Sequence, residues 1–89
     1  MRVALICIDK PDHLHVRQEN RAAHLAYIEA TGVVEMAGPF LDGDSMCGSL
    51  VVLEVENLDA AKAWAAEDPY AKAGLFASVD IRAWKKVIG

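Results

Sequence analysis

The sequence lacks the features that would place it in a membrane or on nucleic acid. Its longest unbroken apolar run is far shorter than the roughly 20 residues that a helix needs to cross a bilayer. Its formal net charge is −4 over 89 residues, with acidic and basic side chains interspersed, which argues against the basic face that nucleic acid or an anionic membrane requires. Because 54% of the residues are hydrophobic, the composition instead predicts one small globular domain spanning residues 1–89.

Cysteine is also scarce. Cys7 and Cys47 lie far apart in apolar surroundings, and neither belongs to a C-x-x-C pair. Without a recognisable signal peptide, we expect reduced, buried thiols in a cytoplasmic protein.

Motifs for metals and cofactors are missing as well. His13 and His15 point to different sides of a helix, and His24 lies about 16 Å further along it than His13, so we expect no metal site. There is no phosphate-binding glycine loop and no dinucleotide fingerprint, so we expect no cofactor.

What is present is a regular alternation of strand and helix patterns. Runs rich in β-branched and apolar residues predict four strands, and apolar residues at helical spacing predict two helices. The strands are expected at 2–9, 33–40, 47–56 and within 75–87, and the helices at 13–31 and 58–67, with one further helical turn at "PYAKAG". This order predicts an α+β, ferredoxin-like βαββαβ fold with a four-stranded antiparallel sheet.

Local signals fix some of the boundaries. Asp12 and Asn57 are expected to cap the two helices at their starts, and Gly32 to end the first one. The segment "LDGDSM" (41–46) is expected to form a polar turn.

The strands carry more apolar residues than one layer of helices can cover. "VALICI" and "LVVL" are apolar at successive positions, which indicates burial on both faces of the sheet. Right-handed crossovers place both helices on one face. We therefore expect a homodimer in which two sheets pack face to face.

The first helix carries basic residues where apolar ones belong. Its apolar stripe consists of Leu14, Leu25 and Ile28. Arg17, Arg21 and His24 lie in or beside this stripe, although burying an unpaired charge costs several kcal/mol. The arginines could lay their stems on the core with their heads in water, and His24 could be a neutral packed ring. Three such residues together favour a polar pocket that accepts an anion or a carboxylate.

Asp68 continues the apolar face of the second helix. It precedes Pro69, so it is a good N-cap for the next turn. A cap uses one carboxylate oxygen, and the second oxygen would remain free for another role.

Five segments of the chain together resemble the YciI-like family. They are "RQENRAAHL", "AGP", "GSLVV", "AKAWAAEDPYAKAGLF" and "WKKV". The resemblance runs through nearly the whole chain, and it implies a dimeric α+β barrel built from ferredoxin-like subunits. It also implies a His–Asp pair, which here is His24 and Asp68. The activity known within the family is dehydrochlorination of a chlorinated hydroxyhydroquinone in aromatic degradation, and related barrels include muconolactone-type isomerases. The 41–46 turn matches the family least.

A carboxylate that accepts from one ring nitrogen of His24 would fix its tautomer and leave the other nitrogen as acid or base. Arg17 or Arg21 could hold a phenolate, enolate or carboxylate.

Three further residues could line the same site. Ser49 and Tyr70 could donate hydrogen bonds to ring oxygens. Asp9 follows the alternation of the first strand and could point at the pocket, or it could be a turn residue before "KPD".

These residues support two functional hypotheses. The first is a cofactor-independent lyase or isomerase acting on a small anionic or phenolic substrate, with His24 as acid or base and Asp68 orienting it. The second is a non-catalytic small-molecule binding module with the same pocket. A structural alternative makes the His24–Asp68 pair a tether between the helices.

Overall fold

The computed structural model describes all 89 residues. The strand and helix order follows the expected βαββαβ pattern, and the further helical turn expected at "PYAKAG" is present as a short helix before the last strand. The elements are β1 (Arg2–Asp9), α1 (Leu14–Thr31), β2 (Val34–Asp42), β3 (Ser45–Glu54), α2 (Leu58–Glu67), α3 (Pro69–Lys72) and β4 (Phe76–Ala83).

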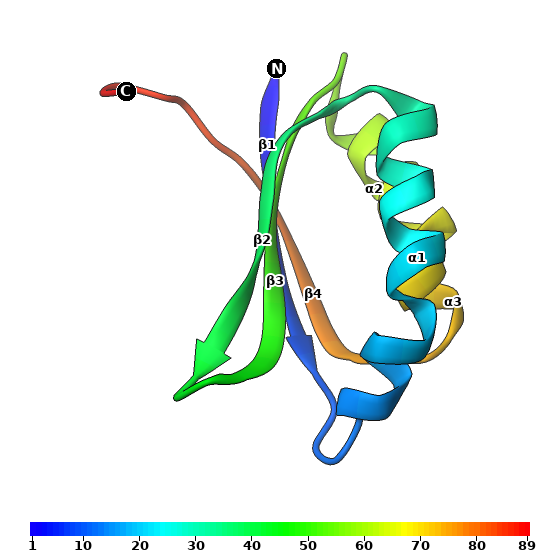
Figure 1. The fold of residues 1–89 in the computed structure, drawn as a ribbon. Helices are drawn as coiled ribbons and strands as arrows, with labels where there is room; N and C mark the ends of the chain where they lie inside the picture. The colour runs from blue at the N-terminus through cyan, green and yellow to red at the C-terminus, as the bar shows by residue number, and fades with distance from the viewer.

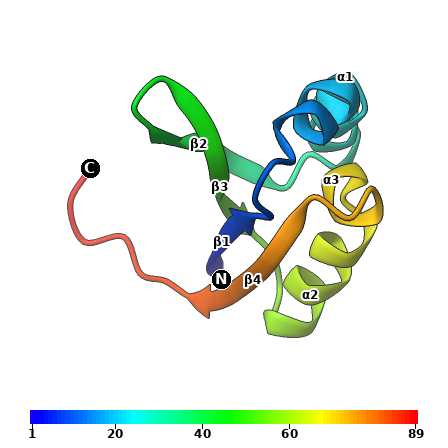
Figure 2. The same cartoon turned by 90° about the horizontal axis from the view of Figure 1, so that it is seen from below.

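The four strands form one sheet in the order β2-β3-β1-β4, and every neighbouring pair is antiparallel. All three helices lie on one face of this sheet, and the other face is bare (Figures 1 and 2). The expected ferredoxin-like fold is therefore confirmed. No helix is both long and apolar enough to cross a membrane.

The hydrophobic core lies between β1, β3 and α2. Alternate residues of the two central strands face the helices, and α2 contributes a small residue and a large one. The buried members are Val3, Leu5, Cys7, Val51, Leu53, Ala61 and Trp64.

The helix boundaries confirm two of the three expected end signals. The side chain of Asn57 accepts a hydrogen bond from the Ala60 N–H at 2.8 Å, and Gly32 ends α1 in the left-handed conformation with φ of 65°. The Asp12 cap is wrong. Asp12 itself has a φ of 60°, and the N-cap position of α1 is occupied by His13, whose side chain makes no capping bond.

The turn expected at 41–46 is shorter than predicted. β2 continues to Asp42 and β3 begins at Ser45, so Gly43 and Asp44 alone connect them. Gly43 has a φ of 61°, the geometry that two-residue hairpin turns require. The polar composition of the segment concealed the strand ends on either side.

The bare face of the sheet carries exposed apolar residues. Ile8, Met36 and Leu50 all belong to this face, and each is exposed in the single chain. Three neighbouring strands thus present apolar side chains that no element of this chain covers. The face-to-face homodimer remains a prediction.

Candidate active site

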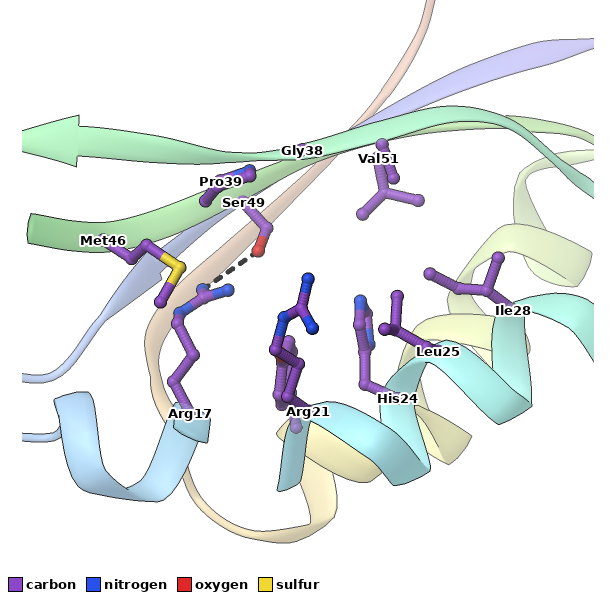
Figure 3. A pocket seen from close by; sticks show the side chains of 12 residues that line it. Arg17, Arg21, His24, Leu25, Ile28, Gly38, Pro39, Met46, Ser49 and Val51 are labelled. Carbon is purple, nitrogen blue, oxygen red and sulfur yellow. Dashed lines mark hydrogen bonds between the residues drawn. The ribbon is translucent and has the colours of Figure 1, made fainter. Parts of the chain in front are cut away.

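The side of α1 that faces the sheet buries charged residues and leaves its leucines exposed. Arg17 and His24 are only 3% and 6% exposed, whereas Leu25 is 46% exposed and Leu14 is also exposed. The expectation that Leu14 and Leu25 form the packing stripe is therefore wrong. The helix is turned so that its basic residues point towards β3, as Figure 3 shows.

Arg17 is fixed by a buried ion pair. Its Nε and Nη2 donate to the two carboxylate oxygens of Asp9, each at 2.8 Å, and Nη2 also donates to Ser49 Oγ at 2.9 Å. Burial alone lowers the pKa of the guanidinium, but the hydrogen bonds and the charge of Asp9 outweigh burial and raise the pKa above its ordinary value. Arg17 is therefore a permanently charged group held in one orientation.

His24 is held by Asp68 on the neighbouring segment. Nδ1 of His24 lies 2.8 Å from Oδ1 of Asp68, and the backbone N–H of Tyr70 donates to the same oxygen at 3.0 Å. Asp68 is thus the N-cap of α3 and the partner of His24 at once. The expectation that the two roles use different carboxylate oxygens is wrong, because Oδ1 serves both.

This bond defines the chemistry of the ring. A carboxylate can only accept, so Nδ1 of His24 carries a proton and donates to Asp68. In the neutral ring, Nε2 is then the acceptor, and no protein group is bonded to it. The geometry leaves Nε2 available to take a proton from a ligand.

Tyr70 is a platform beneath both basic residues. The His24 ring stacks on it with 3.9 Å between centroids and 14° between planes, and the Arg17 guanidinium carbon lies 4.8 Å from the Tyr70 centroid. Burial raises the pKa of the Tyr70 hydroxyl, and the charges of Arg17 and Arg21 oppose this only in part. The hydroxyl therefore remains a hydrogen-bond donor at neutral pH.

A cavity of about 170 Å³ lies between α1 and the β2–β3 hairpin (Figure 3). One side is polar and basic, and the other is apolar. Its lining residues are Arg17, Arg21, His24, Leu25, Ile28, Ala37, Gly38, Pro39, Met46, Ser49, Val51 and Tyr70. An engineered apolar cavity of roughly 150 Å³ in another protein takes up benzene, so this space suits a single six-membered ring.

The structure brings all seven residues singled out in the sequence into one cluster. Five of them line the cavity: Arg17, Arg21, His24, Ser49 and Tyr70. Asp9 and Asp68 do not line it. Each lies behind it and holds a cavity residue, so Asp9 borders Arg17 and not the cavity itself.

Sequence reasoning missed the contribution of the hairpin. Met46 and Pro39 line the cavity, but Met46 had been placed in a turn and Pro39 at a strand end. Strict alternation along β3 would place Met46 on the face opposite Ser49 and Val51. Met46 reaches the cavity because the strand register shifts between Phe40 and Leu41, and no local signal in the sequence showed this shift. No three His, Cys, Asp or Glu side chains come together as a metal ion would require.

Gly48 explains why a Gly-Ser pair stands in β3. A Cβ at this position would lie 2.3 Å from the backbone oxygen of Cys7, which real Cβ atoms do not approach. Glycine therefore lets β3 come close to β1 at the position next to Ser49. A larger residue would have to shift the backbone that carries the Ser49 hydroxyl.

Comparison with known families agrees with this architecture. The model of the YCII-related domain matches residues 1–85. The chain belongs to this family. Protein YciI of Escherichia coli O6:H1 is 40% identical over an alignment 89 positions long, covering 89% of this chain and 91% of the relative. An uncharacterized protein of Haemophilus influenzae is 37% identical over an alignment 97 positions long, covering 98% and 99% of the two chains.

Solved structures show the same fold. The 5-chloro-2-hydroxyhydroquinone dehydrochlorinase of Burkholderia phenoliruptrix, in complex with 2,5-dihydroxybenzoquinone, matches this YCII-family chain with a TM-score of 0.86 and 36% identity over 96% of this chain and 94% of that one. An antibiotic biosynthesis monooxygenase matches with a TM-score of 0.61 at 10% identity, which shows a common fold alone.

Proposed function

We propose that this protein is a cofactor-independent lyase that removes hydrogen chloride from a small, chlorinated and hydroxylated ring. The observation that carries the proposal is the His24 ring, tied at Nδ1 to Asp68 and facing a ring-sized cavity with its other nitrogen. The similarity to a dehydrochlorinase whose structure holds a dihydroxybenzoquinone supports the reaction class and the ligand class.

The charges around the cavity favour an anion. Arg17 is neutralised by Asp9, but Arg21 forms no ion pair and reaches the same space. With a neutral His24, the Asp68 carboxylate lies behind the ring, so Arg21 is the charge that borders the cavity without an ion-pair partner of its own. A ring with one ionised hydroxyl matches this charge, and the Ser49 and Tyr70 hydroxyls are available to its other oxygens.

Loss of hydrogen chloride needs proton transfers at two kinds of atom. A ring hydroxyl gives up its proton, and the chlorine-bearing carbon gains one by tautomerisation. When a second hydroxyl loses its proton, its oxygen becomes a carbonyl and the electron pair passes through the ring and leaves with chloride. The ring loses one proton and one chloride in total, with no outside oxidant.

His24 and the arginines divide this work. Nε2 of His24 accepts a hydroxyl proton and can return it to carbon, with Asp68 stabilising the charged ring. Arg21 and Arg17 stabilise the oxyanion. A positioned acid–base group typically contributes about 10²–10⁴-fold in rate.

The test is chloride release from 5-chloro-2-hydroxyhydroquinone under anaerobic conditions, combined with binding of 2,5-dihydroxybenzoquinone followed by its absorbance. His24→Ala should lower chloride release by about 10²–10⁴-fold and change quinone affinity only a few-fold. His15→Ala is the matched control, because His15 lies exposed on the same helix and does not line the cavity. Unchanged turnover in His24→Ala would overturn the assignment of His24.

A second measurement separates the enzyme from the two alternatives. Nitrogen chemical shifts of the His24 ring should show Nδ1 protonated in the native protein and mixed tautomers in Asp68→Asn. A binding module would hold the quinone and release no chloride even in the native protein. A tether would lose stability in His24→Ala, by roughly 1–3 kcal/mol, with no ligand effect.

A further inference from the structure

The last six residues form an extended arm that leaves the sheet. We call residues 84–89 the C-terminal arm. Its last bond to the sheet runs from the Trp84 N–H to the Arg2 carbonyl at 3.0 Å. Beyond it, Val87 and Ile88 are 82% and 91% exposed. Figures 1 and 2 show the arm departing on the face of the sheet that no helix covers.

A separate hollow lies at the same end of the sheet, away from the active-site cavity. We call it the end hollow. It is lined by Met1, Val33, Glu54, Val55, Glu56 and Ala60, so four apolar side chains are flanked by two carboxylates. Glu56 forms no ion pair, and Glu54 pairs only with the exposed N-terminal ammonium at 3.2 Å.

The arm and the end hollow are chemically complementary. The arm presents Lys85 and Lys86 directly before its two exposed aliphatic residues, and neither lysine forms an ion pair within the chain. A pair of aliphatic side chains preceded by two positive charges matches an apolar floor flanked by two negative charges. Within one chain the two features do not meet, because the arm leaves on the bare face (Figure 1).

We propose that the arm of one copy docks in the end hollow of a second copy packed against the bare face, so that a dimer exchanges both arms. This inference rests on the predicted face-to-face dimer. Two stacked sheets lie about 10 Å apart, and six extended residues span about 20 Å. An arm can therefore pass over the end of the partner sheet when the two copies bring the same ends together. The two lysines and the two aliphatic residues of the arm then gain neighbours that they lack in one chain. These residues are Lys85, Lys86, Val87 and Ile88.

The test is a disulfide between two differently tagged, co-expressed chains, both with Cys47→Ser. One chain carries Ile88→Cys and the other Ala60→Cys. The matched control replaces Ala60→Cys with Ala66→Cys, an exposed position on the same helix about 9 Å away from the hollow. We expect the disulfide between the two tagged chains to form at least tenfold more with Ala60→Cys than with Ala66→Cys. Equal yields, or no disulfide between the chains, would overturn arm exchange.

Light scattering separates failure of the arm from failure of the dimer. A native dimer without the disulfide overturns the arm alone, whereas a native monomer at every concentration overturns both.

Removing residues 84–89 should weaken dimerisation at least tenfold, with unchanged far-ultraviolet circular dichroism because the arm lies outside the core. Lys85→Glu with Lys86→Glu should weaken it as well, and adding Glu54→Lys with Glu56→Lys should restore it. Undiminished dimerisation of the shortened chain would contradict the proposal.

Discussion

The two long helices cover the same sheet and bury opposite kinds of side chain. α2 buries Ala61 and Trp64 against β1 and β3, in the hydrophobic core. α1 buries Arg17 and His24, and a cavity separates it from the hairpin. One half of the fold is therefore filled with apolar side chains, and the other half keeps space and charge.

The difference shows how a chain of 89 residues can carry both a core and a candidate site. A polar side chain can be buried only when its hydrogen bonds are satisfied, and the α1 side achieves this through Asp9 and Asp68. Two hydrogen bonds also join α1 to α2. The Tyr27 hydroxyl donates to the Trp64 carbonyl, and the Trp64 indole N–H donates to the Thr31 hydroxyl. The filled half thus holds one end of α1 in place while the other end borders the cavity.

The largest effect is expected where the filled half loses its main side chain. Trp64→Ala should lower the free energy of unfolding by about 3–5 kcal/mol, because it removes a buried aromatic ring and leaves a cavity. Urea unfolding followed by circular dichroism measures this without relying on tryptophan fluorescence. Trp64→Phe, which keeps an aromatic ring, should cost much less. A loss no larger than that of an exposed leucine would contradict the assignment of stability to the α2 side.

The next effect tests the polar half through its ion pair. Asp9→Asn should cost about 3 kcal/mol, because it leaves the Arg17 charge buried without its partner. Replacing both residues, with Asp9→Leu and Arg17→Met, should recover much of the loss in stability but not ligand binding. Asp80→Asn is the control, because the Asp80–Arg82 pair is exposed and its loss should have no measurable effect on unfolding. If Asp9→Asn and Asp80→Asn lowered the free energy of unfolding equally, the buried pair would contribute no more to stability than the exposed one.

Much of this architecture could be predicted from the sequence. The periodicity of strands and helices can be read from short stretches of sequence. The same holds for the helix-end signals at Asn57 and Gly32, because they depend on neighbouring residues. The segment 41–46 was misread, because polar residues that extend a hairpin look the same as residues of a loop.

The rotation of α1 could not be read from its pattern. Leu14 and Leu25 have the right spacing for a packing face, but the helix presents Arg17 and His24 instead. What decides the rotation is the set of partners on β1 and before α3, which are distant in sequence. The unusual position of the basic residues nevertheless indicated the cavity that they line, because buried charged residues need partners or a polar space.

The burial of the Cys7 thiol can be tested through the pH dependence of stability. Burial raises the pKa of this thiol to about 12, from about 9 for an exposed thiol. Between these values the unfolded chain loses the proton and the folded chain keeps it. Stability is therefore fully present below pH 9 and is lost as the pH rises towards 12, by up to about 1.4 kcal/mol per pH unit from this group. The free energy of unfolding of Cys7→Ala should fall less steeply with pH than that of the native protein. Parallel curves would show that water reaches the thiol.

The smallest stability effect is expected at Leu25, which the sequence pattern assigned to the packing face. Leu25→Ala should change the free energy of unfolding by less than about 1 kcal/mol, because nearly half of the side chain is already exposed. The same side chain lines the cavity, so affinity for the proposed ligand 2,5-dihydroxybenzoquinone should fall a few-fold. Leu14→Ala, an exposed change on the same helix that does not touch the cavity, should leave affinity unchanged. If Leu25→Ala instead destabilised the fold as much as Trp64→Ala, both helices would pack alike and the distinction between a filled half and a site half would be lost.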